Sequence, residues 1–497
     1  MTGTAIVLIP PLVIIMLVLL TRRVIPSLGV GIILSSLIFE NFHFGDTIKR
    51  IGKTILHLFY EDGEVATGNL HVLGFLLLLG VMTGMIHLLG GGRAFGEFAS
   101  KKLHSKRQVT MGTALFGMTM FPDDVFNMFT NGQVSRPLFD RFGISREKLA
   151  YMIHSTSDPL CVLTPISSWG AYITSIFAAI FVMHDMDANP IVTFVEVGFL
   201  NFYALTTIAL VFLVAYFDLR FWKMRKAESH VKPYDSNDSH RKGSIWSLFI
   251  PIIVLMISSI GLLIWTGYRN SDTKSIVDWF ANGEVSYSLL MGALAACLVT
   301  FVFTIRTKQV KLVPQALING MKTTLPAVWI LLFAWMQSEL TGLLKTGEYL
   351  GGIIEQTSLS SSWLPFLLFI LTGIMAFSTG TSWGTFAIML PISAQIGLVT
   401  GVDITPLFAA VLSGSLFGDH CSPISDTTTV AASAAGCNHM NHVLTQIPYA
   451  LTAASITAGA FLFYGLTGIS WISYLFILLM LTGITVIYRR KEAKQTV

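Results

Sequence analysis

Residues 413–433 read SGSLFGDHCSPISDTTTVAAS, a polar stretch between two apolar runs. It holds Asp419, His420 and Asp426 among serine and threonine hydroxyls. A charged side chain near the centre of a bilayer costs about 2.5–3.5 kcal/mol. In a membrane protein such residues face the protein interior or a water-filled cavity, and they often mark an ion or proton pathway.

The rest of the chain has the composition of a membrane protein. Of its 497 residues, 53% are hydrophobic and 12% are charged, whereas about 25% are charged in a typical soluble domain. Apolar runs that suit helices crossing about 30 Å of hydrocarbon recur between residues 5 and 488. The ten-residue alternating segments of a barrel are not seen. We therefore predict an all-α polytopic membrane protein with roughly 11–13 transmembrane helices.

A related stretch lies 258 residues upstream. STSDPLCVLTPIS (155–167) shares five of its thirteen residues with 413–425. The same shift places FPDDVFNMFTNG (121–132) on TGTSWGTFAIML (379–390), where no residue matches but both segments interrupt an apolar run. Proline and glycine break the hydrogen-bond ladder of a helix, and lipid offers no replacement partners. Two such breaks in each half indicate a transport site near the bilayer midplane.

Basic residues divide the chain near its middle. Residues 220–242 contain seven lysines and arginines, and the tail beyond residue 488 contains four. The positive-inside rule predicts that the central loop and the C-terminus are both cytoplasmic. We predict a first transmembrane repeat at 1–219, a cytoplasmic basic linker at 220–245 and a second repeat at 246–497. Topology alone accounts for the charge of the linker, so we expect no nucleic-acid partner.

The acidic and hydroxyl side chains of the four breaks form the candidate site. Hard cations prefer oxygen ligands, and one or two carboxylates with hydroxyls and freed carbonyls suit Na⁺. A buried carboxylate can also hold a proton in place of the cation. Competition at one carboxylate would exchange Na⁺ for H⁺ without covalent chemistry. The candidate ion- or substrate-binding residues are Asp123, Asp124, Asn127, Ser155, Ser157, Thr164, Ser167, Thr381, Ser382, Asp419, Ser422, Ser425, Asp426 and Thr427.

Several acidic residues have a purely structural alternative. Asp426 precedes TTTVAASAA and would cap a half-helix. Asp123 would be an interfacial turn residue, and Asp158 would stabilise a turn before Pro159. His420 would be a hydrogen-bonded core imidazole. We leave both interpretations open for each residue.

Other chemistry is not favoured. Cys421 and Cys437 lack the spacing that usually indicates a zinc cluster, and we interpret NHMNH (438–442) as a loop at the membrane surface. We find no nucleophile–base arrangement and no HExxH motif. We therefore expect no enzymatic activity and no cofactor beyond the transported or coupling ions.

Two segments carry a family resemblance. GDHCSPISDTTTVAASAAGCNHMNHVLTQIPYAL (418–451) closely resembles the signature of NhaC-type sodium/proton antiporters, and 121–159 resembles the first-half motif of that family. The resemblance implies inverted repeats with re-entrant hairpins, as in the wider ion-transporter superfamily, and sodium-linked exchange. Carried over to this chain, it implies that the Na⁺ ligands are Asp124, Asn127, Asp419 and Asp426.

The resulting prediction is a bacterial inner-membrane antiporter that exchanges Na⁺ for H⁺. Val125 and Phe126 stand where many members have Tyr and Ala, and relatives of the family carry organic acids or amino acids. A second interpretation therefore stays open, a Na⁺- or H⁺-coupled carrier of a small organic solute such as an amino acid or a carboxylate. Half-helix N-termini at SPIS and TPIS would hold a carboxylate group. We expect the lipid bilayer as a partner, and a homodimer as in related transporters.

Overall fold

A computed structural model describes most of the chain, and it is helical apart from one short hairpin. Strands β1 (Tyr60–Glu61) and β2 (Glu64–Val65) pair antiparallel. The described residues are 4–21, 23–61, 64–91, 94–95, 98, 101–229, 244–271, 279, 282–307, 310–345, 349, 360–423 and 425–495. The predicted linker at 220–245 lies partly outside them, because 230–243 are not described.

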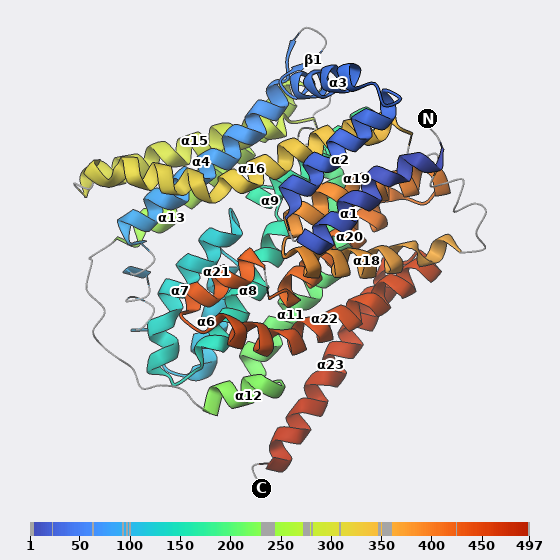
Figure 1. Cartoon of the computed structure of the whole chain (residues 1–497). Coiled ribbons are helices and arrows are strands. Elements are labelled where there is room, and N and C mark those ends of the chain that lie inside the picture. Colours follow the sequence, from blue (N-terminus) through green and yellow to red (C-terminus); the bar gives the residue numbers. More distant parts are fainter. Residues whose placement is uncertain are drawn as a thin grey trace.

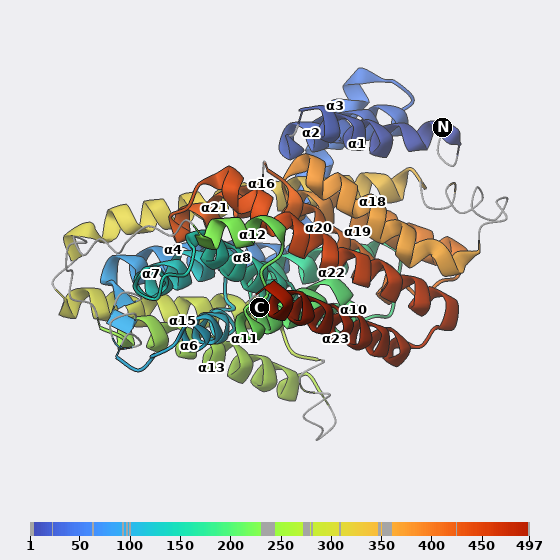
Figure 2. The same ribbon diagram turned by 90° about the horizontal axis from the view of Figure 1, so that it is seen from below.

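The first half begins with a small group of helices that Figure 2 shows at one edge of the molecule, α1 to α3. The remaining helices of this half surround the first pair of breaks. The elements are η1 (Ala5–Leu8), α1 (Ile9–Thr21), α2 (Val24–Phe39), α3 (Phe44–His57), α4 (Thr67–Leu89), α6 (Lys106–Gly117), α7 (Asp124–Arg141), α8 (Arg146–Leu163), α9 (Ser168–Met183), α10 (Pro190–Leu200), α11 (Phe202–Phe217) and α12 (Trp222–Ser229).

The second half repeats the alternation of long and broken helices. Its elements are α13 (Trp246–Arg269), α15 (Val285–Arg306), η2 (Val310–Leu312), α16 (Val313–Leu343), η3 (Ser361–Trp363), α18 (Leu364–Thr379), α19 (Ser382–Thr400), α20 (Ile404–Cys421), α21 (Asp426–Ala435), α22 (His439–Thr467) and α23 (Ser470–Gln495).

The predicted all-α membrane class is confirmed. Nine helical segments of the described chain are long and apolar enough to cross a membrane, or ten if the bent pair α10–α11 counts as one span. Two shorter apolar helices, at Ala5–Ile14 and Ile25–Phe39, would bring the number into the predicted range if they also cross. The chain is therefore a multi-pass membrane protein.

Helices α4, α13, α15 and α16 form a layer beside the rest of the molecule (Figure 1). Within this layer α4 and α16 run antiparallel and touch through small residues. A Cβ built on Gly80 would lie 2.4 Å from the carbonyl oxygen of Gly320, and one on Gly84 would lie 2.5 Å from that of Ala316. Small residues allow such close approach of membrane helices. The contact between α4 and α16 therefore stabilises the layer against which the broken helices pack.

The end of the first half and the end of the chain meet on one face. The ring of Phe221, just before α12, stacks on that of Tyr488 in α23 at 4.2 Å between centroids. The guanidinium of Arg489 lies 5.0 Å from the ring centroid of Phe217. Figure 1 shows α12 and the C-terminus at the same end of the molecule. The described start of the linker, α12, and the end of α23 therefore lie at the same end of the molecule (Figure 1).

Candidate functional site

The helix breaks recur at one constant spacing. Asp124 and Ser382, which begin α7 and α19, are 258 residues apart, and so are the first residues of α8 and α20, their last residues, and the first residues of α9 and α21. The turns between these helices use Gly143 and Gly401, both at positive φ, a conformation that glycine adopts without penalty. The repeat predicted from the sequence thus has matching helix bounds; the inversion of one half relative to the other stays a prediction.

The capping residues at the breaks also correspond. The side chain of Asp123 accepts a hydrogen bond from the Phe126 amide, and that of Thr381 accepts one from the Gly384 amide. Ser167 and Ser425 do the same for the residues three positions on. Each cap satisfies one of the free amides at a helix start. Four of the predicted site residues therefore hold the breaks in shape.

The breaks of the two halves lie together. Helix α21 packs on α7 and α8, while α19 packs on α9 and α20 packs on α8. Figure 1 shows α7, α8 and α21 side by side. The start of a second-half helix is therefore placed among first-half helices, as a shared site requires.

Two carboxylates are buried at this junction. Asp124 is 4% exposed in the first turn of α7, and Asp419 is fully buried in the last turn of α20. Two further carboxylates, those of Asp158 and Asp426, interact electrostatically with Asp124 and also with Asp419. Negative charge therefore concentrates where the breaks meet.

Thr427 joins Asp419 to its surroundings. Its hydroxyl donates to Asp419 Oδ2 in a short hydrogen bond and lies 2.9 Å from the hydroxyl of Ser425. The second carboxylate oxygen of Asp419, Oδ1, is buried and has no hydrogen-bond partner among the described residues. This oxygen is available to a cation.

Asn127 presents a similar oxygen from the other half. Its Nδ2 donates to the carbonyl of Gly117 at 2.9 Å, which fixes the amide. Its Oδ1 is buried and, within the described part of the chain, accepts no hydrogen bond. A buried acceptor without a donor is costly, so this side chain is oriented for a ligand that binds oxygen.

Several predicted residues have other roles. Asp426 does not cap α21, because Ser425 does; it occupies the first helical position, and its side chain is exposed. Asp123 is a cap rather than an interfacial turn residue, and its Oδ2 also accepts from Ser168 at 3.0 Å. Asp123 thereby joins the two breaks of the first half.

The hydroxyls of the first-half break mostly bond to backbone. Ser157 and Thr164 each donate to the carbonyl four residues earlier, and Ser167 donates to Cys161 and Thr164 carbonyls. Ser382 donates to the Ser415 carbonyl at 3.2 Å. Ser155 and Ser422 are buried, Ser155 within α8 and Ser422 at the break. Among the hydroxyl residues predicted for the site, Thr427 is one whose hydroxyl bonds to a carboxylate, that of Asp419.

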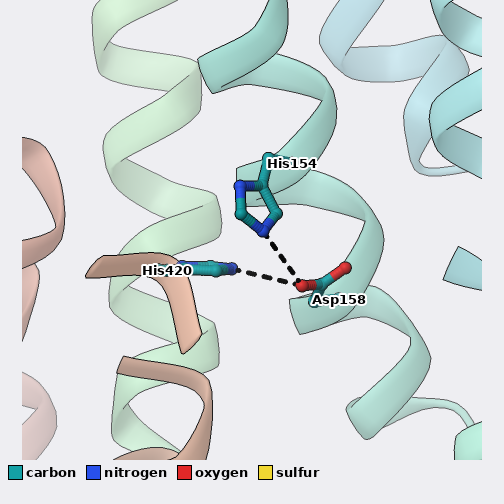
Figure 3. A group of neighbouring side chains, drawn as sticks. All are labelled: His154, Asp158 and His420. Atoms are coloured by element: carbon teal, nitrogen blue, oxygen red, sulfur yellow. Dashed lines mark ion pairs between the residues drawn. The ribbon is translucent and has the colours of Figure 1, made fainter. Parts of the chain in front are cut away.

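A second buried cluster was not predicted as a unit. His154, Asp158 and His420 have side chains that converge from α8 and α20 (Figure 3). Asp158 lies inside α8, so its interpretation as a turn residue was wrong, although Pro159 does follow it within the helix. The prediction of a loop at 438–442 was wrong, because Asn438 caps α22 and His439 begins it. The start of this helix is at the surface, with Met440 and Asn441 exposed, but His442 is fully buried. The sequence feature that could have indicated this cluster is the presence of His154, His420 and His442 in three different segments that form separate helices.

Comparison with known proteins identifies the class of transporter. The model of the Na⁺/H⁺ antiporter family matches residues 160–466. An uncharacterized protein of Haemophilus influenzae is 38% identical over 472 residues, which cover 92% of this chain and 90% of that protein. The malate-2H⁺/Na⁺-lactate antiporter of Bacillus subtilis (32% identical) and the Na⁺/H⁺ antiporter NhaC of Alkalihalophilus pseudofirmus (28%) each align with 30% of this chain and 32% of their own length.

A solved structure shares the fold. The crystal structure of the YdaH transporter of Alcanivorax borkumensis superposes with a TM-score of 0.60 over 84% of this chain and 89% of that one, at 14% identity. The helical transporter architecture is therefore shared with a protein of very different sequence. Together with the family match over more than half of the chain, the resemblance inferred from the two motifs is confirmed. The chain belongs to the Na⁺/H⁺ antiporter family.

Proposed function

We propose that this protein exchanges Na⁺ for H⁺ through one oxygen-lined site at the paired helix breaks. The observation that carries the proposal is the pair of buried, unpartnered oxygens, Asn127 Oδ1 and Asp419 Oδ1, among the described residues. Each comes from a different half of the chain, and each side chain is fixed by a hydrogen bond through its other polar atom. Oxygen ligands of this kind suit a hard alkali cation.

The charges supply the driving force for cation binding. Asp124 and Asp419 are buried, and the charged groups that act most strongly on them are carboxylates. Buried charge without compensation is strongly unfavourable. A bound Na⁺ or a bound proton relieves the same excess of negative charge, so the two exclude each other. We assign Asp124, Asn127 and Asp419 to the cation, with the exposed Asp426 at the entrance.

Two cavities support access from both sides. One of about 480 Å³ is lined by Asp123 and the start of α7, the C-terminal end of α4 and the first turns of α16. The other, of about 820 Å³, is lined by the opposite ends of α4 and α16 and by α9. Both cavities border helices that begin at a break. We propose that they are the two vestibules of an alternating-access transporter and that the face with the basic linker is cytoplasmic.

A second candidate is a Na⁺-coupled carrier of a small organic solute. The 480 Å³ cavity next to Asp123 is far larger than a cation needs, since a water occupies about 30 Å³. One relative is named as an antiporter of malate and lactate with Na⁺ and protons. The half-helix starts at Ser168 and Asp426 would favour a carboxylate group through the positive end of the helix dipole.

Reconstitution distinguishes the two candidates. Proteoliposomes with a trapped pH-sensitive dye receive an inward Na⁺ gradient without any organic solute. We expect the lumen to become more alkaline, because protons leave as Na⁺ enters. If protons move only after a dicarboxylate, hydroxy acid or amino acid is added, the second candidate replaces the first.

A further inference from the structure

Asp158 lies between two imidazoles in the protein interior. Its Oδ2 is 3.3 Å from His154 Nε2 and 3.7 Å from His420 Nε2. Figure 3 shows both rings directed at this carboxylate. The three side chains are 0–2% exposed. Neither oxygen of Asp158 has a hydrogen bond of ordinary geometry among the described residues.

The tautomer of His154 follows from its neighbour Gln446. The Nε2 of Gln446 lies 3.0 Å from the carbonyl oxygen of His420 and 2.8 Å from His154 Nδ1. An atom beside a carbonyl oxygen must be the amide nitrogen, because the amide oxygen would be repelled there. Gln446 therefore donates to His154 Nδ1, and the proton of neutral His154 sits on Nε2.

This tautomer decides what the cluster can bind. Two histidines and a carboxylate within 4.8 Å of one another could in principle hold a transition metal. A metal ion would have to bind the lone pair of His154 Nε2. The proton of the ring would then be on Nδ1, where it would face the amide hydrogens of Gln446. The geometry instead turns an N–H of His154 toward Asp158. This arrangement disfavours a metal ion at His154 Nε2.

The N–H of His154 faces two oxygen atoms. Besides Asp158 Oδ2 it faces the hydroxyl of Thr427, 3.0 Å away. Thr427 in turn donates to Asp419. A hydroxyl that accepts one hydrogen bond becomes a better donor in the next. When Asp158 is protonated, His154 is free to favour Thr427, so the state of Asp158 is transmitted to Asp419.

The surroundings of Asp158 contain other titratable groups, on each neighbouring helix. The hydroxyl of Tyr203 in α11 lies 3.0 Å from His420 Nδ1, and His442 Nε2 in α22 lies 3.2 Å from His154 Nδ1. The acidic groups that interact with Asp158 electrostatically are Asp123 and Asp124 of α7, Asp419 of α20 and Asp426 of α21.

We propose that Asp158 is the proton-binding group of the exchanger, separate from the carboxylates that bind Na⁺, with His154 and Thr427 as positioning residues that link it to Asp419. The inference rests on the proposed Na⁺/H⁺ exchange. Ionised Asp158 adds negative charge beside Asp419 and favours a cation there, whereas a proton on Asp158 removes that charge. By linkage, Na⁺ at Asp419 equally disfavours the proton on Asp158, which is the coupling an antiporter needs.

Replacing Asp158 by asparagine tests the separation of the two roles. In proteoliposomes we expect Asp158→Asn to lose Na⁺-driven proton movement but to retain exchange of radioactive for unlabelled Na⁺. In the wild-type protein the Na⁺ concentration for half-maximal Na⁺/Na⁺ exchange should rise at least about fivefold from alkaline to acidic pH, and in Asp158→Asn it should not depend on pH. Proton movement of wild-type size in this variant would overturn the proposal.

Controls separate this result from other failures. Asp403→Asn keeps the helix cap of α20, since asparagine caps as well as aspartate, and should behave as the wild type. If the wild-type protein moves no protons in response to Na⁺, the proposed Na⁺/H⁺ exchange is refuted. That outcome is distinct from a failure of the role assigned to Asp158. If Asp158→Asn does not fold, Asp158→Glu serves instead: it should keep proton coupling with a displaced pH profile. An unchanged profile in Asp158→Glu would also refute the assignment.

Discussion

Gly132 allows α7 to touch α21, and a methyl group placed there tests whether this contact positions the site. A Cβ built on Gly132 would lie 2.6 Å from the carbonyl oxygen and 2.9 Å from the Cβ of Ala434. Ordinary contacts are about 3.5–4.0 Å. Gly132→Ala should therefore move α21 away from α7 by about 1 Å, and with it Thr427 and its hydrogen bond to Asp419.

The expected result is loss of transport in a folded protein. Overpacking of this kind costs about 1–3 kcal/mol, which a large membrane protein can tolerate. A displacement of about 1 Å at a reacting centre costs about a hundredfold in rate in enzymes, and we expect at least about a tenfold loss of Na⁺-driven proton movement. Proteoliposome assays measure the transport rate, and thermal unfolding in detergent measures the stability.

Gly112→Ala in α6 is the matched control. Among the described residues, its Cβ would meet the side chain of Leu103 alone, at 3.5 Å. Alanine stabilises a helix interior by about 0.5–1 kcal/mol relative to glycine. This variant should transport as the wild type does. Equal transport rates for Gly132→Ala and Gly112→Ala would show that the α7–α21 contact does not position the site.

Three further predictions concern single side chains. Asp124→Asn and Asp419→Asn should each abolish transport while folded protein stays in the membrane, as fluorescence size-exclusion chromatography and the dye assay will show; normal transport by both would remove them from the mechanism. Asn127→Leu should raise the half-maximal Na⁺ concentration about tenfold, equivalent to about 1.4 kcal/mol for one oxygen ligand, and an unchanged value would exclude Asn127 as a ligand. Burial raises the pKa of Asp218, but Lys148 and nearby Arg220 outweigh it and hold that pKa below its usual value. The stability from this pair is therefore present above the unfolded-state pKa of about 3.9 and is lost as pH falls. Asp218→Asn should lower the melting temperature at pH 7 and reduce its fall toward pH 3; the same fall as in the wild type would contradict the ion pair.

The breaks were predictable because they leave a local signal. Proline, glycine and hydroxyl residues interrupt apolar runs at 155–167 and 413–425, and a helix must end where its hydrogen-bond ladder is interrupted. The constant spacing of 258 residues followed from five identities, and the helix bounds agree with it. Burial of Asp124 and Asp419 also followed, since a charge within a membrane segment has to face the protein interior.

The cluster around Asp158 could not be predicted in the same way. Its partners His420 and Gln446 are distant in sequence, and nothing in a local pattern says which helices α8 will contact. The local pattern also gave a wrong prediction for Asp158. An aspartate before a proline usually indicates a turn, whereas in the structure the helix continues through Pro159. The exposure of Asp426 likewise depends on how α21 packs and not on its own sequence.

The two halves share their backbone but not their chemistry. At the spacing of 258 residues, Asp419 corresponds to Cys161, Asp124 to Ser382, and Asp158 to Leu416. Cys161 donates its thiol to the carbonyl of Phe121, so the first-half counterpart of the cation carboxylate only braces the neighbouring break. Matching backbones supply two similar breaks that can open alternately. Each of these carboxylates is present in only one of the two halves. The buried charges therefore lie at a single junction, where they are partly compensated. Two separate buried ion sites would each need their own compensation.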